Sequence, residues 1–132
     1  MKILHIGKRG NLQRFTQKSS ILRTMTLVDV PMNEPVSAYL KEGADADFII
    51  ADAMAPVTGE LIRSMQNLKL IHSEGVAYNS FDLEAADACG VYVCNSKGMN
   101  AVAVAEQAVL LMVGMLRNVA QGDAAVRAGH QI

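Results

Sequence analysis

Short apolar runs alternate with amphipathic segments along most of the chain. Runs of this length, apolar at consecutive positions, are typical of strands that are buried on both faces. The pattern predicts five strands, at residues 2–7, 24–30, 47–51, 68–73 and 91–94. The segments between them predict helices at residues 33–41, 58–67 and 82–90, and room for a helical turn within residues 11–20.

Capping residues mark the ends of the predicted helices. Thr58 and Asp82 stand where a side-chain oxygen accepts a backbone N–H of the first helical turn, and Gly43 and Gly90 suit helix ends. Strands separated by helices form parallel βαβ units. Residues 1–99 are therefore predicted to be a flavodoxin-like α/β domain with a doubly wound, parallel five-stranded sheet.

The remaining residues, 100–132, follow a different pattern. A helical pattern runs over residues 101–121, and Asn100 stands at its N-cap position. This helix is apolar on nearly every side, so it must be buried on more than one side. A five-stranded layer covers only one side, which predicts a second subunit or an absent domain against the other.

Charge and composition narrow the class of protein. Twelve Lys and Arg residues balance thirteen Asp and Glu residues over 132 residues, and only 5% of the residues are aromatic. This balance argues against a nucleic-acid-binding surface. The longest uninterrupted apolar run, residues 108–116, is far shorter than the roughly 20 residues of a membrane span. No secretory signal is evident, and Cys89 and Cys94 are expected to be reduced thiols, so a cytoplasmic protein is expected.

The turn after the fourth predicted strand is the first candidate site. In open parallel sheets, ligands bind beyond the carboxyl ends of the strands. Gly75 lets the backbone approach a ligand closely, and the consecutive N–H groups of Val76 and Ala77 suit a carboxylate. An ordinary glycine turn would have the same residues, so spacing alone does not decide between a carboxylate-binding turn and a purely structural one.

Two further loops carry candidate chemistry. Residues 95–100 lead into the long helix, where free N–H groups suit an anion or cofactor near Asn100, although plain helix capping explains them equally well. Asp52 follows the third strand, where a phosphoacceptor receiver domain keeps its aspartate, but the loop at residues 7–10 is basic and would repel the metal that a receiver needs.

His5 lies inside a strand and is expected to be a satisfied core histidine. The cysteine spacing predicts no metal site.

Glycine spacing excludes one binding motif. No two glycines are separated by a single residue, so the motif G-x-G-x-x-G is absent from the sequence. The chain therefore carries no glycine-rich phosphate loop for a dinucleotide.

Two motifs at characteristic spacing point to a family. Residues 75–86 read G-V-x-Y-x-x-x-D-L-x-A-A, and residues 100–106 read N-A-x-A-V-A-E. With them, the sequence from about Ala44 to Gly129 resembles the D-isomer-specific 2-hydroxyacid dehydrogenases, in particular their N-terminal substrate domain. The resemblance implies a two-domain enzyme that transfers a hydride between NAD or NADP and a 2-hydroxy or 2-oxo acid.

The resemblance also implies roles for individual residues. The amides of Val76 and Ala77 hold the substrate carboxylate, and Val104 lies near the nicotinamide. The helix at residues 101–121 crosses between the two domains and packs in a homodimer interface. The catalytic Arg, Glu and His of the family lie later in the sequence than Ile132. The chain is therefore expected to be a fragment that is inactive by itself.

Departures from the family pattern bear on the substrate. Asp52 and Ala53 replace a frequent Arg-Ser pair, which makes a phosphoglycerate-type substrate doubtful. Glu74 replaces a small residue beside the carboxylate-binding turn, which narrows the pocket or favours a substrate with a hydroxyl or amino group.

The alternative functions for the protein are a non-catalytic, corepressor-like dinucleotide sensor and a stand-alone receiver-like module. The particular acid, and the choice between NAD and NADP, remain open.

Overall fold

A computed structural model describes residues 1–16 and 18–130. The chain divides into two compact units, Met1–Lys97 and Gly98–Ile132, and each unit is described by itself.

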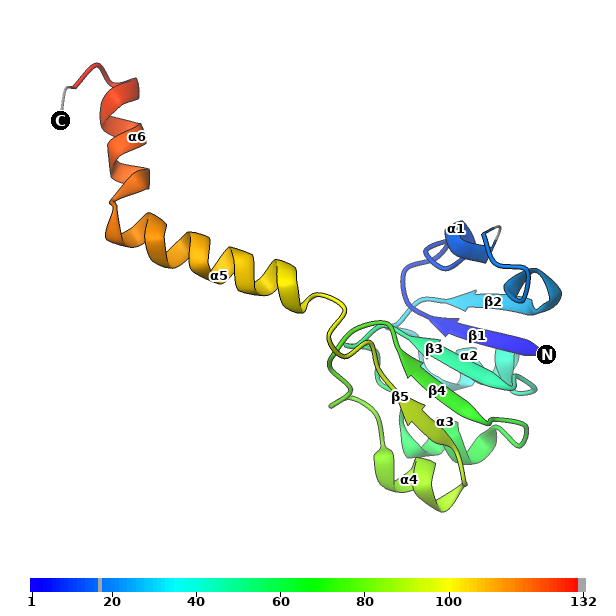
Figure 1. Ribbon diagram of the computed structural model, residues 1–132. Helices are drawn as coiled ribbons and strands as arrows, with labels where there is room; N and C mark the ends of the chain where they lie inside the picture. Colours follow the sequence, from blue (N-terminus) through cyan, green and yellow to red (C-terminus); the bar gives the residue numbers. More distant parts are fainter. Residues whose placement is uncertain (17, 131–132) are drawn as a thin grey trace. The chain divides into compact units, whose positions relative to one another are not determined.

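The first unit alternates strands and helices (Figure 1). Its elements are β1 (Lys2–Ile6), α1 (Gln13–Thr16), the short 3-10 helix η1 (Leu22–Thr24), β2 (Thr26–Val30), α2 (Val36–Gly43), β3 (Phe48–Ala51), α3 (Gly59–Ser64), β4 (Leu70–Ser73), α4 (Leu83–Ala88) and β5 (Tyr92–Cys94). All strand pairs are parallel, and the order across the sheet is β2-β1-β3-β4-β5. This is the flavodoxin-like order, so the predicted α/β fold is confirmed.

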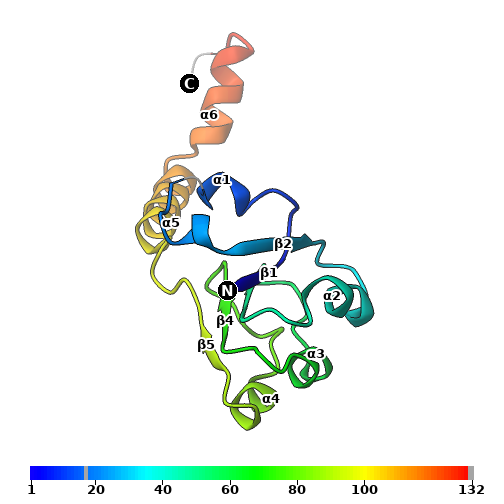
Figure 2. The same ribbon diagram turned by 90° about the vertical axis from the view of Figure 1, so that its right-hand side faces the viewer.

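The core lies between the sheet and one layer of helices. Helix α2 packs on β1 and β2, α3 contacts both α2 and α4, and α4 packs beside β5, so these helices line one side of the sheet (Figure 2). The largest fully buried side chains of this core are Tyr39, Leu4, Ile6, Ile49, Leu61, Ile62 and Ile71. The expectation that every strand is buried on both faces holds for β1 but not for β3 and β4, where buried and partly exposed residues alternate. The reason is that α2, α3 and α4 share one face.

Local capping signals are largely confirmed. Thr58 Oγ1 accepts the Leu61 N–H at 3.3 Å, and Asp82 Oδ1 accepts the Ala85 N–H at 2.9 Å. Gly90 ends the α4 region with a φ of +66°, a conformation that favours glycine.

Helix α2 ends at Gly43, as predicted, but Gly43 does not have the left-handed conformation of a typical glycine cap. It is the last residue of α2, and the right-handed Ala44 follows it. A Cβ at Gly43 would lie 2.9 Å from Leu4 Cδ1. The glycine is therefore needed for the close approach of α2 to β1, not for helix termination.

The prediction of one helix over residues 101–121 is wrong. Helix α5 spans Ala101–Leu116 and α6 spans Val119–Arg127, with a bend of 62° between them. The break occurs at Asn118, whose φ of 50° is left-handed, a conformation that asparagine tolerates better than most residues. Asn100 occupies the N-cap position of α5, as predicted, but its side chain makes no capping hydrogen bond.

No residue of α5 is buried, although the helix is almost entirely apolar. Among the described helices, none is by itself long and apolar enough to cross a membrane. Only the bent pair of α5 and α6, taken together, meets the length and composition of a span.

Acid should weaken the folding of the first unit through two aspartates beside the start of β3. The Lys69 ammonium, 2.7 Å from Asp47 Oδ1, and then the Lys2 backbone N–H hold the pKa of Asp47 below its ordinary value of 3.8. The Lys2 side chain likewise lowers the pKa of Asp45. Because these carboxylates are more acidic when folded, their stabilisation is complete above their ordinary pKa and is lost as pH falls through the lowered one.

Urea unfolding at a series of pH values from neutral to strongly acidic measures this effect. Asp47→Asn should flatten the loss of stability at the acidic end. Asp87→Asn is the control, because Asp87 is exposed and its side chain makes no hydrogen bond within residues 1–16 and 18–130. If the Asp47→Asn variant and the parent chain lose stability equally at acidic pH, Asp47 does not contribute to the acid sensitivity.

Candidate functional site

The candidate site lies at the edge of the sheet where the parallel strands end. Residues that follow β1, β3, β4 and β5 meet at this edge, because parallel strands have their carboxyl ends on the same side. Its central feature is the turn at residues 74–77, directly after β4, which is called the carboxylate turn below. Of the residues predicted for substrate binding, Glu74, Gly75, Val76 and Ala77 belong to this turn.

Three carbonyl groups of the carboxylate turn, those of Gly75, Val76 and Ala77, accept hydrogen bonds from neighbouring residues. The Gly75 carbonyl accepts the Ser96 N–H at 2.9 Å, and the Val76 carbonyl accepts the Asn95 side-chain amide at 2.7 Å. The Ala77 carbonyl accepts the Ser73 hydroxyl at 2.6 Å. These bonds tie the turn to β4 and to the segment after β5.

Some N–H groups of the same turn donate hydrogen bonds within the domain, and others have no acceptor among the described residues. The Glu74 N–H donates to the Ala51 carbonyl at 2.8 Å, and the Gly75 N–H donates to Ser73 Oγ at 3.3 Å. Among the described residues, no acceptor faces the N–H of Val76 or of Ala77. Both residues are exposed, so two adjacent donors remain available to an anion.

Ala53 explains why a glycine stands in this turn. A Cβ on Gly75 would lie 2.8 Å from the Ala53 Cβ, closer than real Cβ contacts come. Ser80 Oγ donates to the Ala53 carbonyl at 2.9 Å, which holds the Ala53 loop against the turn region. The glycine therefore permits a close contact between two loops and needs no unusual backbone conformation.

Asp52 lies at the same edge, after β3. Its Oδ1 accepts the Met54 N–H at 2.9 Å, and its own N–H donates to the Ile6 carbonyl at 2.8 Å. One carboxylate oxygen is therefore used to shape its loop.

His5 and Asp29 are site residues that the sequence reasoning missed. His5 is fully buried, as expected, and its Nδ1 lies 2.5 Å from Asp29 Oδ1. Its Nε2 lies 3.2 Å from Glu74 Oε1, but the alignment is too poor for a hydrogen bond, so Nε2 has no hydrogen-bond partner in the described part of the chain. The expectation of a satisfied core histidine is therefore wrong for one ring nitrogen. A charged residue inside the second apolar run, Asp29, was the available signal.

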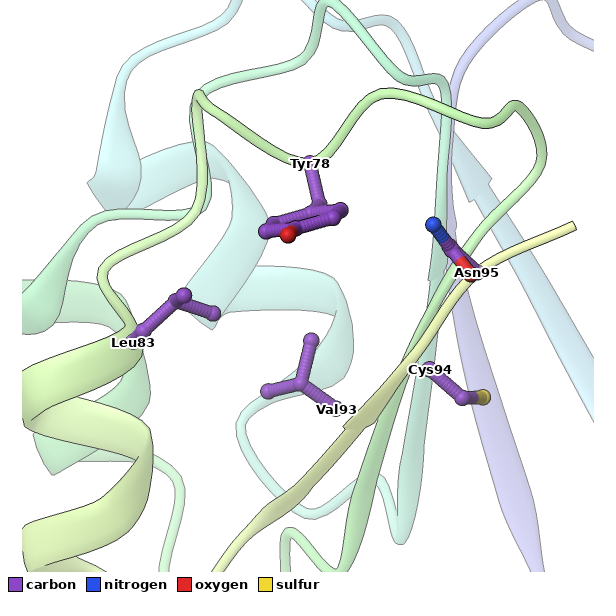
Figure 3. Close-up of a pocket in the computed structure, with 5 residues that line it drawn as sticks. All are labelled: Tyr78, Leu83, Val93, Cys94 and Asn95. Atoms are coloured by element: carbon purple, nitrogen blue, oxygen red, sulfur yellow. The ribbon is translucent and has the colours of Figure 1, made fainter. Parts of the chain in front are cut away.

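A shallow cavity of about 190 Å³ lies beside the carboxylate turn (Figure 3). The side chains of Tyr78, Leu83 and Val93 point towards one another there, whereas the Cys94 side chain points away from them (Figure 3). On that other face, Cys94 Sγ lies 3.1 Å from His72 Nδ1. The cavity is therefore lined mainly by apolar groups.

The predicted cofactor residues lie in the second unit. Val104 on α5 is exposed, and Asn100 precedes the helix with a side chain that caps nothing. No group of three or more His, Cys, Asp and Glu side chains within residues 1–16 and 18–130 has a metal-binding arrangement.

Comparison with known proteins points to one family. The family model of the D-isomer specific 2-hydroxyacid dehydrogenase catalytic domain matches residues 9–131. D-3-phosphoglycerate dehydrogenase 2 of Arabidopsis thaliana, a chloroplastic protein, is 34% identical over 111 residues, which are 83% of this chain and 18% of that protein. Glyoxylate reductase of Thermococcus litoralis is 30% identical over 100 residues, which are 76% of this chain and 30% of that protein.

Solved structures agree. The NAD-dependent formate dehydrogenase of Staphylococcus aureus, in complex with NAD, matches with a TM-score of 0.75 and 27% identity, over 100% of this chain and 42% of that one. The chain thus spans less than half the length of these relatives. Because the family model of the catalytic domain matches most of its residues, the chain belongs to the D-isomer-specific 2-hydroxyacid dehydrogenase family.

Proposed function

We propose that this chain is the substrate-binding portion of an NAD(P)-dependent 2-hydroxyacid dehydrogenase and holds the substrate carboxylate on the N–H groups of Val76 and Ala77. One observation carries the proposal. Every carbonyl from Gly75 to Ala77 is hydrogen-bonded to the body of the domain, while the N–H groups of Val76 and Ala77 have no acceptor in the described part of the chain. Two adjacent, fixed donors match the two oxygens of a carboxylate.

The charges beside the turn favour a small, singly charged acid. Asp52 and Glu74 both place a carboxylate near the end of the sheet. Like charges repel, and a phosphorylated acid carries more negative charge than a simple 2-oxo acid. We therefore propose a non-phosphorylated 2-hydroxy or 2-oxo acid as the substrate class.

For the cofactor, we propose that Val104 and Asn100 contact the nicotinamide end of NAD or NADP. The residues present fit this limited role, since Val104 offers an exposed apolar side chain and the Asn100 amide is not used for capping. The sequence has no G-x-G-x-x-G motif, so these residues do not hold the pyrophosphate. The cofactor supplies or accepts the hydride, and this chain orients the acid that exchanges it.

Nuclear magnetic resonance of the ¹⁵N-labelled chain tests the carboxylate site. Titration with pyruvate should shift the Val76 and Ala77 amide signals saturably, at millimolar concentrations. Sodium chloride at matched ionic strength controls for screening. Shifts of the same size with chloride, or unmoved amides, would contradict the proposal.

Asn95→Ala should weaken pyruvate binding about two- to tenfold, because one hydrogen bond that orients the turn contributes roughly 0.5–1.5 kcal/mol. The lost bond is the one from the Asn95 side-chain amide to the Val76 carbonyl. Asn79→Ala is the matched control, since Asn79 is exposed in the neighbouring loop and its side chain makes no hydrogen bond within the described ranges. If the two variants bind pyruvate with equal affinity, the bond from Asn95 to the Val76 carbonyl does not orient the carboxylate turn for binding.

We also propose that a second copy of the chain covers the apolar faces of α5. The supporting observation is that large apolar residues on this helix are exposed, among them Leu110, Leu111, Met115 and Leu116. Exposed apolar surface of this kind marks an interaction site. Analytical ultracentrifugation should find a dimer, and Leu110→Lys should convert it to a monomer. A monomeric parent chain would overturn the proposal.

Finally, we propose that the chain does not catalyse hydride transfer by itself. The roles proposed above for the described residues are to bind and orient the acid and to contact the cofactor. The chain mixed with NADH and pyruvate, glyoxylate or hydroxypyruvate should therefore show no loss of NADH absorbance above the rate without protein. A rate that saturates with the acid would contradict this.

A further inference from the structure

A buried histidine lies between two carboxylates at the edge of the carboxylate turn. The His5 side chain is fully buried, and the Asp29 side chain is only 6% exposed. The Glu74 side chain, in contrast, is 25% exposed. The three residues therefore form a line from the interior to the surface, with Glu74 at the outer end.

The inner end of this line is fixed from two sides. His5 and Asp29 are direct partners in the register of β1 and β2, which places Asp29 Oδ1 2.5 Å from His5 Nδ1. The second oxygen of Asp29 accepts the Gly10 N–H at 3.2 Å. With its Nδ1 anchored, the imidazole ring has a fixed orientation that directs Nε2 towards Glu74.

Gly7 keeps the space between the ring and Glu74 open. A Cβ at Gly7 would lie 2.9 Å from His5 Nε2 and 3.7 Å from Glu74 Oε2. Any side chain there would push into the gap. The backbone thus leaves His5 and Glu74 facing each other without an intervening group.

The unpaired Nε2 of His5 indicates that the Glu74 carboxylate is its hydrogen-bond partner when the site is occupied. A buried polar atom without a hydrogen bond is unfavourable, and Nε2 has none among the described residues. A small rotation of the Glu74 carboxylate brings Oε1, already 3.2 Å away, into alignment with Nε2. Oε2, which lies 3.7 Å from the position of a Gly7 Cβ, would then be the carboxylate oxygen left to accept a hydrogen bond from a ligand.

We propose that Glu74, positioned by His5 and Asp29, determines specificity by accepting a hydrogen bond from a hydroxyl or amino group on the side chain of the 2-oxo acid. The inference rests on the proposed function, because Val76 and Ala77 hold the other end of the same ligand. Glu74 directly precedes Gly75, so a small acid held by the turn presents its substituent beside this carboxylate. An ionised carboxylate only accepts hydrogen bonds, so it selects a donor over a methyl group and repels an anionic substituent.

Hydroxypyruvate and pyruvate form a matched pair of probes, since they differ by one hydroxyl group. Titrations of the ¹⁵N-labelled chain, followed at the Val76 and Ala77 amides, should show that hydroxypyruvate binds about tenfold more tightly, as expected for a hydrogen bond to a charged acceptor. In Glu74→Ala the ratio of the dissociation constants for pyruvate and hydroxypyruvate should fall to about one. Glu74→Gln, which keeps one acceptor oxygen, should restore part of the preference for hydroxypyruvate.

The positioning role of His5 has its own readout. The Nε2 resonance of ¹⁵N-labelled His5 should shift when hydroxypyruvate binds and stay unchanged with pyruvate. His5→Gln and Asp29→Asn should each lower the ratio of the dissociation constants for pyruvate and hydroxypyruvate. Asp29→Asn serves as the second variant if His5→Gln fails to fold.

The outcomes separate the two proposals. If neither acid shifts the Val76 and Ala77 amides, both the proposed function and this inference fail. If both acids shift these amides with equal affinity, or if Glu74→Ala keeps the preference, the carboxylate site stands and the specificity role of Glu74 is overturned. If the preference depends on Glu74 but not on His5 and Asp29, the positioning part is overturned.

Discussion

Gly75→Ala is expected to abolish carboxylate binding at the turn. The added Cβ would lie 2.8 Å from the Ala53 Cβ, and neither group is a flexible chain end that can swing away. The backbone of the turn must move instead, which strains the bonds that hold the Gly75 and Val76 carbonyls to Ser96 and Asn95. Overpacking of this kind costs about 1–3 kcal/mol of stability.

The measurement combines the amide shifts on pyruvate titration with thermal unfolding. We expect no saturable shift at Val76 and Ala77 in Gly75→Ala, together with a lowered midpoint of unfolding. Ala53→Gly removes the opposing Cβ, so the double variant Gly75→Ala, Ala53→Gly should recover both binding and stability. Ala53→Gly alone is the matched control. Normal pyruvate binding by the single Gly75→Ala variant would show that the loop contact does not set the turn.

Leu4→Ala should destabilise the first unit by about 2–5 kcal/mol, the range for truncation of a buried leucine. Leu4 is fully buried in β1, a strand that has neighbours on both sides in the sheet. Its side chain also packs against the position of Gly43, where a Cβ would lie only 2.9–3.1 Å away. The cavity left by truncation would therefore open at the contact of α2 with the sheet.

Urea unfolding followed by circular dichroism measures this change. Met54→Ala is the control, because Met54 is 75% exposed and its truncation should change the unfolding free energy by no more than about 0.5 kcal/mol. A similar loss in Leu4→Ala and Met54→Ala would contradict the placement of the core.

The two regions of the chain differ in how well sequence patterns predicted them. In the first unit, each predicted strand is present, with an observed start one or two residues later at most strands, because the apolar runs are also the buried segments. In the second unit, apolar spacing continued past residue 116 and concealed the break at Asn118. Periodicity reports which side chains are apolar, whereas a single left-handed residue changes the direction of the backbone without changing that pattern.

The candidate site shows the same division. The carboxylate turn was found because glycine after a parallel strand is a local signal. The residues that bind its carbonyl groups, Ser73, Asn95 and Ser96, were not predicted, because their hydrogen bonds come from β4 and from the segment after β5. His5 was predicted to be an ordinary core residue for a similar reason. Residues close to His5 in the sequence do not reveal that Glu74 lies beside it in the fold.

The sequence by itself thus determined the number of strands, their parallel arrangement, the caps at Thr58 and Asp82, and the turn at Gly75. Each of these depends on apolar periodicity or on residues within one helical turn or loop. Only the tertiary structure decided that Gly43 serves packing against Leu4, that the Val76 and Ala77 donors remain free, and that His5 faces Glu74 at 3.2 Å. These contacts join residues far apart in the chain, and sheet register and loop packing, not local pattern, bring them together.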